Sequence, residues 1–315
     1  MNKKIGFAGL LVLTGCATLI PLKVGPPIDI TVEITPERGA KGEYLVNNVT
    51  HCLHCHSELD QNYYSFPPVP GTEGAGGFVI EEAFGMVQVP NITPHALGDW
   101  TDGELIQAIT EGVNRERKPL FPIMPYDRLR YLDREDLSCI VAYIRTLKPI
   151  KNAVSGKKKL KFPLQYIERT FPHPYDPLTR PDPSDVVAYG KYMTIISNCE
   201  VCHTPTDKMG RPLEGMYMAG GQEFLLPGGS VILTANVTPD QETGIGNRSK
   251  ENFIGLFKAF QTPVEVPEDK KHENTLMPWF AYTNMTEEDL GAIYEYLMTL
   301  EPVNNSVVKY PTASE

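Results

Sequence analysis

The sequence predicts an all-α protein in which two copies of one small domain stand in tandem, joined by a Pro-rich connector. Three observations support this prediction. The pattern C-x-x-C-H occurs twice, at residues 52–56 and 199–203. Short segments around each motif repeat in the same order along the chain. Each copy also closes with an amphipathic pattern of helical period, at about residues 133–149 and 286–302.

The repeat and its flanking segments divide the chain into six parts. We expect a signal peptide at 1–15, a tether at 16–38, a first domain at 39–150, a connector at 151–185, a second domain at 186–303 and a tail at 304–315. With 315 residues, 41% of them hydrophobic, the chain is long enough to give each domain its own core. The formal net charge of −10 argues against a nucleic-acid partner, because such partners require a basic surface.

The N-terminus has the pattern of an export signal. Two lysines precede an apolar run at 5–13, which is too short to span a bilayer. The sequence LTGC at 13–16 resembles the lipobox of bacterial lipoproteins, in which the signal is cut before the cysteine and the cysteine is lipidated. We therefore expect Cys16 to carry lipid and to anchor a periplasm-facing protein to a membrane. An ordinary secretory signal with an unmodified Cys16 is the alternative.

The repeated segments define the register between the two copies. They lie on both sides of the C-x-x-C-H motifs. In chain order they are Gly42-Glu43-Tyr44 and Gly190-Lys191-Tyr192, Ala75-Gly76-Gly77 and Ala219-Gly220-Gly221, Asn91-Ile92-Thr93-Pro94 and Asn236-Val237-Thr238-Pro239, and Met124-Pro125 and Met277-Pro278. Only small loop changes separate the two sets, so one domain has been used twice.

The closing helix of each copy has a start and a stop signal. Asp133 and Thr286 are the expected N-caps, and an aspartate follows each three residues later, as in a capping box. Pro149 and Pro302 end the two patterns. Cys139 falls inside the first of these helices, where we expect a packed, unreactive thiol.

The C-x-x-C-H motifs indicate the cofactor. Two cysteines separated by two residues on a helical turn direct both sulfurs to one side, and the histidine follows directly. This pattern is typical of c-type haem attachment, with the histidine as an iron ligand. We therefore expect two covalently bound haem c groups. The residues assigned to them are Cys52, Cys55 and His56 in the first copy and Cys199, Cys202 and His203 in the second.

Local disulfides and a structural zinc site are the alternatives for these cysteines. An exported chain is able to form disulfides. Zinc sites also use paired C-x-x-C motifs, although these usually lie about 15 to 20 residues apart. Neither alternative explains why a histidine directly follows the second cysteine of both motifs.

The group that fills the second axial position of each iron decides whether the site transfers electrons or catalyses a reaction. A methionine thioether in that position raises the reduction potential and excludes small molecules. Only Met124 and Met277 repeat in register, 68 and 74 residues beyond the motif histidines. A proline follows each methionine and restricts it to extended conformations, which suit a loop over a haem face. We predict both as iron ligands; the alternative is that they are ordinary core methionines.

The two halves resemble the cytochrome c domains in the cytochrome subunits of bacterial membrane-bound alcohol, aldehyde and gluconate dehydrogenases. The repeated segments carry the resemblance, together with Gly98-Asp99-Trp100-Thr101 and Thr243-Gly244-Ile245-Gly246. It implies two all-helical, class I-like cytochrome c domains that exchange electrons by outer-sphere transfer, with no catalytic residue required. Those subunits typically carry three such domains, whereas this chain has two. Arg248 stands where the family pattern has tryptophan.

The resemblance implies a dihaem electron carrier. It would link a periplasmic or membrane dehydrogenase to a downstream respiratory acceptor such as a cytochrome or an oxidase. The main alternative is a dihaem enzyme such as a cytochrome c peroxidase, which needs one iron open to peroxide with acid/base groups beside it. The matched methionine loops argue against that asymmetry. A thiosulfate-oxidising enzyme and a sensory or structural haem lipoprotein are further alternatives.

Overall fold

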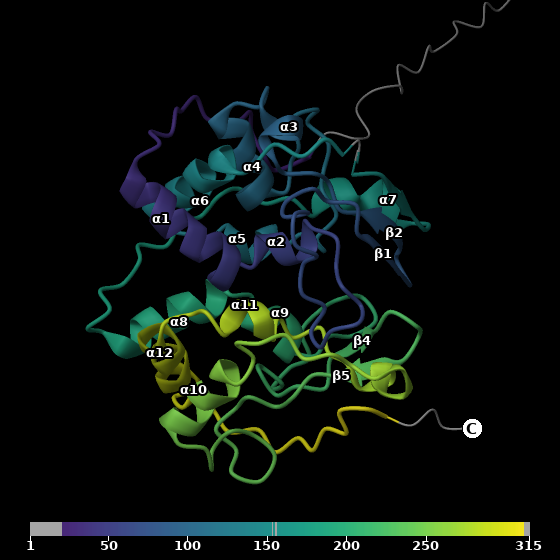
Figure 1. The fold of residues 1–315 in the computed structure, drawn as a ribbon, viewed down its shortest axis with the longest axis vertical. Coiled ribbons are helices and arrows are strands. Elements are labelled where there is room, and N and C mark those ends of the chain that lie inside the picture. The colour runs from purple at the N-terminus through teal and green to yellow at the C-terminus, as the bar shows by residue number, and fades with distance from the viewer. Residues whose placement is uncertain (1–20, 153, 155, 312–315) are drawn as a thin grey trace, which may run out of the picture.

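The computed structural model describes residues 21–152, 154 and 156–311. Figure 1 shows two lobes, with the first half of the chain in the upper lobe and the second half in the lower one. The expected signal peptide and Cys16 lie outside the described residues. Within the described part of the chain, every helix is too short or too polar to cross a membrane.

Helices provide most of the regular structure in both lobes. Those of the first half are α1 (Pro36–Tyr44), α2 (Cys52–Cys55), α3 (Pro94–Leu97), α4 (Asp102–Glu111), α5 (Tyr126–Leu129) and α6 (Arg134–Thr146). Those that follow are α7 (Leu164–Ile167), α8 (Val186–Ile196), α9 (Cys199–His203), α10 (Lys250–Lys258), α11 (Trp279–Tyr282) and α12 (Glu287–Leu297). Short π- and 3₁₀-helical turns lie at Leu45–Val49, Glu168–Thr170 and Glu268–Glu273.

Each half is built around one close helix pair, and a repeated glycine explains the close approach. Helix α1 packs along α6, and α8 packs along α12. A Cβ atom on Gly42 would lie 2.0 Å from the carbonyl oxygen of Cys139, and one on Gly190 would lie 1.9 Å from that of Ala292. The glycine before each C-x-x-C-H motif therefore allows backbone contact with the closing helix.

The prediction of an all-α fold is wrong, because the structure contains two antiparallel sheets. Strands β1 (Val79–Glu82), β2 (Gly85–Gln88) and β3 (Lys158–Leu160) form one sheet in the order β1-β2-β3. Strands β4 (Glu223–Leu225) and β5 (Val231–Leu233) form the other. These strands of three or four residues are too short to give a clear alternation in the sequence.

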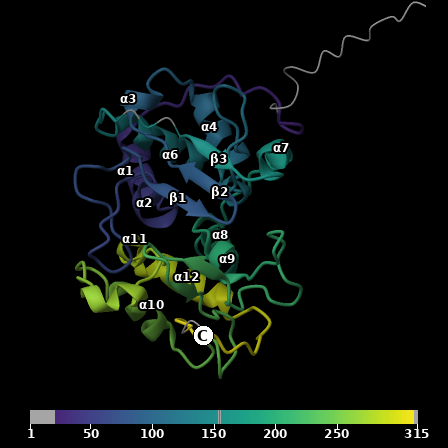
Figure 2. The same ribbon diagram turned by 90° about the vertical axis from the view of Figure 1, so that its right-hand side faces the viewer.

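Part of the expected connector belongs to the first lobe. Its strand β3 pairs with β2, with Lys159 opposite Met86. Further along, the backbone N–H groups of Asp176 and Leu178 donate to the carbonyl oxygens of Arg130 and Tyr131, directly after α5. The segment thus covers the first half before the chain enters α8, as Figure 2 shows for β3 and α7.

The two lobes share one continuous apolar core, and motif helices lie at their junction. Buried side chains of both halves, such as Ile140 and Leu290, belong to the same cluster. Helix α5 contacts α8, and α11 contacts the π-helical turn before α2. Figures 1 and 2 both show α2 facing α8, α9 and α11 across the junction, and Figure 1 shows α5 beside α2. The fold therefore brings the two C-x-x-C-H motifs to the same interface.

Candidate functional site

The first C-x-x-C-H motif forms a single helical turn. Helix α2 begins directly after His51, whose backbone is left-handed with φ of 39°. His56 follows the turn and is 8% exposed. Its Nδ1 lies 2.8 Å from the carbonyl oxygen of Pro90. Because a carbonyl oxygen only accepts, Nδ1 holds the proton and Nε2 keeps the lone pair that a metal ligand needs.

The second motif repeats this arrangement. Helix α9 begins after Asn198, which is again left-handed with φ of 60°. The Nδ1 of His203 lies 2.7 Å from the carbonyl oxygen of Ala235. Burial lowers the pKa of both motif histidines, which favours the neutral, ligating form of each ring. Two histidines at equivalent positions thus have the same tautomer and the same free nitrogen.

The repeated segments after the motifs hold these carbonyl groups in place. Pro90 and Ala235 directly precede the N-[IV]-T-P segments. In the first copy, Asn91 donates to the carbonyl oxygen of Ile150 at 2.8 Å, beyond the closing helix. In the second, Asn236 donates to that of Val303 at 2.7 Å. Each segment therefore ties the histidine-binding carbonyl to the end of its closing helix.

A repeated glycine forms a backbone hydrogen bond with each motif histidine. The N–H of Gly76 donates to the carbonyl oxygen of His56 at 2.9 Å, and that of Gly220 donates to His203 at 2.8 Å. Both glycines have positive φ, 67° and 72°. A Cβ on Gly76 would lie 2.5 Å from the carbonyl oxygen of Pro90. Only glycine allows the backbone this close to the histidine.

The structure joins neither pair of motif cysteines as a disulfide. Among the described residues, no group of three or more histidine, cysteine or acidic side chains is arranged to hold a metal ion. Burial raises the pKa of Cys55 and of Cys199 to about 12. Cys139 is 2% exposed inside α6, as expected for a packed thiol.

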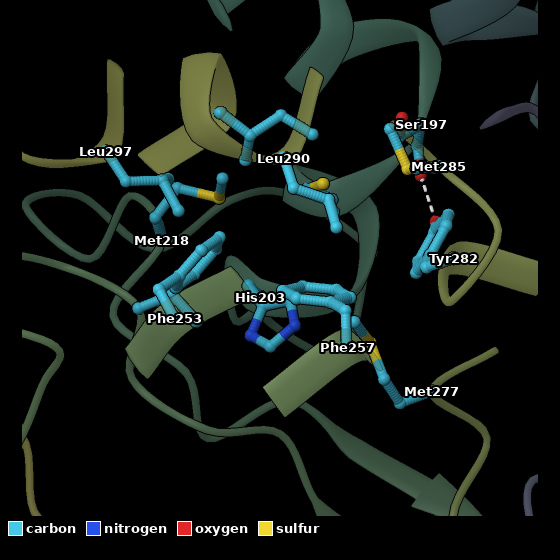
Figure 3. Close-up of a pocket in the computed structure, with 13 residues that line it drawn as sticks. Ser197, His203, Met218, Phe253, Phe257, Met277, Tyr282, Met285, Leu290 and Leu297 are labelled. Carbon is cyan, nitrogen blue, oxygen red and sulfur yellow. Dashed lines mark hydrogen bonds between the residues drawn. The ribbon is translucent and has the colours of Figure 1, made fainter. Parts of the chain in front are cut away.

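An apolar cavity lies beside the second motif. Its lining is almost entirely apolar. Figure 3 shows His203 and Met277 among its lining side chains, together with Phe253 and Phe257. Cys199 also lines it. Apolar walls, a neutral imidazole, a thiol and a thioether around one cavity are a donor set that fits a haem c group.

Met277 is not the only methionine in this cavity. Met218 and Met285 also line it, and they are 0% and 1% exposed. Sequence repetition singles out Met277, because neither of the other two has a counterpart in register. In the first half, Met124 is partly buried against the same core cluster as Cys52. Met124 and Met277 each stand directly before the Pro that precedes a short helix, α5 or α11.

Side chains in or next to each motif contact a short helix of the other half. Sequence patterns did not identify these side chains as functional. The ring of His51 lies 5.5 Å from that of Tyr282 in α11, and the ring of His54 lies 4.9 Å from that of Phe280. On the other side, Nε of Arg128 in α5 lies 2.5 Å from Oε1 of Glu200, inside the second motif. The negative charge of the Cys202 thiolate also contributes to the raised pKa of Cys55. Only their proximity in space reveals these contacts.

Comparison with known proteins supports a cytochrome. Residues 39–148 match the cytochrome c family. The chain is 26% identical over 313 residues to the cytochrome c subunit of a quinone-dependent alcohol dehydrogenase of Gluconacetobacter polyoxogenes, which covers 95% of this chain and 64% of that relative. It is 27% identical over 283 residues to the fructose dehydrogenase cytochrome subunit of Gluconobacter japonicus, covering 83% of this chain and 52% of that relative.

A third relative is described by its cofactor content. The chain is 29% identical over 182 residues to a dihaem c-type cytochrome of Cereibacter sphaeroides, covering 54% of this chain and 58% of that protein. The aligned part of the chain therefore spans between about half and two thirds of the length of these three relatives.

Proposed function

We propose, from the premise that the chain carries a cytochrome c domain at residues 39–148 and is homologous to cytochrome c subunits of dehydrogenases, that it is a dihaem electron carrier. In this proposal the second half is a second cytochrome c domain, at 186–303. Electrons enter from a periplasmic or membrane dehydrogenase and leave to a respiratory cytochrome or oxidase. The names of the relatives support a dehydrogenase as donor.

In this proposal, three kinds of side chain bind each haem. The cysteine pairs would form the covalent bonds to the haems, and His56 and His203 would ligate the irons. Met124 and Met277 would supply the second protein ligand of each iron. When bound, the haem supplies reversible one-electron exchange at its iron. The carbonyl groups of Pro90 and Ala235 fix the orientation of the two histidine rings.

The observation that carries the proposal is the matching hydrogen bond made by the two histidines. Each donates from Nδ1 to the carbonyl of the residue before an N-[IV]-T-P segment, at 2.8 Å for His56 and 2.7 Å for His203. A second-shell hydrogen bond of this kind orients a metal-binding histidine and increases its basicity. Its presence in both halves supports two haem sites rather than one.

The facing motifs support electron exchange within the chain. Groups from each motif contact the short helix that follows the methionine loop of the other half, through His54 with Phe280 and through Glu200 with Arg128. This arrangement favours a short path between the two cofactors. An electron accepted at one haem would therefore be shared with the other before it leaves the protein.

The proposal also includes a membrane-surface location, held by lipid on Cys16. Its support is the LTGC sequence at 13–16. Labelled fatty acid supplied during expression should be incorporated into the wild-type chain and not into a Cys16→Ser variant. If the wild-type chain incorporates no label, the lipid anchor is wrong even where the electron-transfer proposal holds.

Carbon monoxide binding to the fully reduced holoprotein tests the electron-transfer proposal. Haem content should first be measured as two per chain by the pyridine haemochrome assay. We then expect neither iron to bind carbon monoxide readily, because methionine closes both. Rapid binding at one haem would reveal an open iron and favour the dihaem enzyme. A content of one haem per chain would contradict the dihaem proposal itself.

A further inference from the structure

The two copies depart from their repeat in two loops, and these loops touch each other. In the first half, a bridge between Leu59 and Pro68 closes the loop after the haem motif; in the second, the bridge joins Thr206 and Pro212 around a shorter loop. The second half has the longer segment before its methionine, because Met277 lies six residues farther from its motif histidine than its counterpart does. We call residues 60–66 of the first-half loop the strap.

The strap pairs with the segment that leads to Met277. The backbone N–H of Tyr64 donates to the carbonyl oxygen of Val264 at 2.7 Å. The N–H of Val266 donates back to the carbonyl oxygen of Asn62 at 2.8 Å. The insertion in each half therefore finds its hydrogen-bond partner in the insertion of the other.

A buried asparagine fixes the strap at its tip. Asn274 is 1% exposed. Its Oδ1 accepts from the N–H of Ser65 at 2.8 Å, and its Nδ2 donates to the carbonyl oxygen of Tyr63 at 3.0 Å. The same Oδ1 accepts from the N–H of Thr275 at 2.7 Å. One side chain thus joins the strap to the backbone two residues before Met277.

Ser65 contacts the methionine turn directly. Its hydroxyl donates to the carbonyl oxygen of Met277 at 2.5 Å and accepts from the N–H of Trp279 at 3.0 Å. Ser65 is 0% exposed, so water does not compete for these bonds. The hydroxyl therefore bridges the two backbone groups on either side of Pro278. The backbone of the predicted iron ligand is held by a residue from the other half of the chain.

Aromatic stacking supports the same contact. The ring of Tyr64 stacks on that of Phe260 with centroids 5.5 Å apart and an interplanar angle of 17°. Phe260 in turn stacks on Trp279 at 5.0 Å and 23°. The three rings form a continuous column from the strap to the start of α11. Ring stacking of this kind restricts sideways movement of the turn.

The strap adopts a backbone conformation that its contacts must stabilise. Ser65 and Phe66 have φ of 70° and 50°, in the left-handed region. That region costs about 1 to 2 kcal/mol for each non-glycine residue. Phe66 is 4% exposed and packs in a small cluster with Leu226 and Ile232 of the second half. The conformation thus depends on packing against the other lobe.

The first methionine turn has the same internal hydrogen bond but no counterpart of Ser65 among the described residues. The carbonyl oxygen of Met124 accepts from the N–H of Tyr126 at 2.8 Å, as that of Met277 accepts from the N–H of Trp279 at 2.8 Å. The N–H of Met124 donates to the carbonyl oxygen of Phe121 at 3.1 Å, within its own half. The loop at the strap's position in the second half folds on itself, where Asp207 accepts from the N–H groups of Met209 and Arg211. Among the described residues, the first half thus holds the methionine turn of the second half, whereas the corresponding loop of the second half makes no such hydrogen bond to the first.

We propose that Ser65 is a positioning residue for Met277, through which the first half of the chain sets the ligation and reduction potential of the second haem. This inference rests on the proposed function, because it takes Met277 as an iron ligand. Without the Ser65 hydroxyl the methionine turn loses two hydrogen bonds and gains freedom to withdraw its sulfur. Because a methionine ligand raises the potential of haem iron, weaker ligation lowers it.

Replacing Ser65 in the holoprotein tests this. Ser65→Ala should lower the midpoint potential of one haem and leave the other unchanged in a spectroelectrochemical titration. It should also weaken the red absorption band that a methionine–iron bond gives to ferric haem c, by no more than the share of one haem. Carbon monoxide should bind faster at that haem alone. Asn274→Ala removes the hydrogen bonds to the strap from the second half. It should also lower the midpoint potential of the same haem.

Tyr64→Phe is the matched control. It keeps the stacked ring and removes a hydroxyl that accepts from Lys309 at 3.2 Å and lies beside Tyr310, without contact to the methionine turn. Both potentials should stay at their wild-type values. Unchanged potentials in Ser65→Ala, or an equal shift of both haems, would overturn the inference. If wild-type protein lacks two methionine-ligated haems, the proposed function fails instead, before any variant is compared.

Discussion

The phenol hydroxyl of Tyr192 donates a 2.6 Å hydrogen bond to Oδ2 of Asp136, which lies in the other half of the chain. The same hydroxyl accepts a 3.1 Å hydrogen bond from the backbone N–H of Asp133, the N-cap of α6. In a capping box, the side chain three residues into the helix accepts that N–H. The tyrosine of the second half therefore stands between the two groups and completes the cap of a helix in the first.

The relationship is reciprocal. Tyr44 donates to Oδ2 of Asp289 at 2.5 Å and accepts from the N–H of Thr286 at 3.1 Å. Tyr44 and Tyr192 occupy equivalent positions of the repeat. The two halves thus exchange caps across their junction, and each closing helix is complete only when the other half is docked. This exchange supports the junction at which the two haem motifs meet.

Removing one exchanged hydroxyl should weaken the whole protein. Tyr192→Phe leaves Asp136 with one donor fewer in a buried site and deprives the Asp133 N–H of its acceptor. We expect the free energy of unfolding to fall by about 2 kcal/mol, the usual scale for a hydrogen bond to a charged group. Chemical denaturation followed by circular dichroism measures this. Tyr166→Phe, at a ring that is 64% exposed, should stay within about 0.5 kcal/mol of wild type. Equal stabilities for the two variants would refute the exchanged cap.

Gly76 should be indispensable for the first haem site, although it carries no side chain. In Gly76→Ala the new methyl group would displace the Pro90 carbonyl that holds His56, in addition to the strain of a left-handed alanine. We expect a loss of more than about 2 kcal/mol in stability. The potential of one haem should also change. Redox titration and denaturation of the purified variant report the two effects separately.

Gly71→Ala supplies the matched control for that experiment. Gly71 also has positive φ, 88°, but a Cβ there would meet no atom within 4 Å. This variant should lose only the left-handed strain, about 1 kcal/mol, with both potentials unchanged. If Gly76→Ala is no more harmful than Gly71→Ala, close approach to the histidine is not the reason for the repeated glycine.

Local patterns predicted the closing helices and their N-caps, because these features depend on residues that are close together in the sequence. Asp133 and Thr286 are the N-caps as expected, but neither capping box closes. Thr286 accepts from the N–H of Asp289, and Asp133 accepts from that of Glu135. The carboxylates of Asp136 and Asp289 instead accept from tyrosines of the other lobe. The sequence shows an aspartate in the right place, but its partner comes from a distant segment.

Long-range pairing also explains why the sheets were missed. Strand β3 joins β2 from about 70 residues farther along the chain, at Lys159 opposite Met86. Each strand alone is too short for periodicity to identify. A turn signal was present, since Gly228 and Gly229 follow a proline between β4 and β5 and both have positive φ. The strap was hidden for the same reason: only the two unequal loop lengths marked it.

Removing the cysteines of one motif tests the assignment of haem attachment. A chain with Cys199→Ala and Cys202→Ala should carry one covalent haem instead of two, because both thioether bonds of the second site are lost. Intact-mass measurement under denaturing conditions counts the haems that remain. Cys139→Ala, which removes a buried thiol outside either motif, should keep both. A double variant that retains two covalent haems would show that these cysteines do not attach the cofactor.

Acid should destabilise the junction through His51. Burial lowers the pKa of His51 to about 4, from about 6.5 in an unfolded chain, and its Nδ1 has no hydrogen-bond partner among the described residues. His54 and Tyr282 are the titratable rings that face it. Above pH 6.5 the ring is neutral in both states. As the pH falls from 6.5 toward 4, the unfolded chain binds a proton that the folded chain does not, so stability is lost at up to about 1.4 kcal/mol per pH unit.

His51→Asn isolates this contribution, because asparagine tolerates the left-handed backbone that His51 adopts and does not titrate. Denaturation of both proteins at pH 7, 6 and 5 gives two curves of stability against pH. Below pH 6.5 the free energy of unfolding should fall more steeply with pH in the wild type, by the amount expected for one proton. His54 is present in both proteins, so its contribution does not affect the difference between the curves. Parallel curves would mean that His51 is protonated equally in the folded and unfolded chains. The junction between the motifs would then admit the charge, contrary to the apolar contact that its rings make.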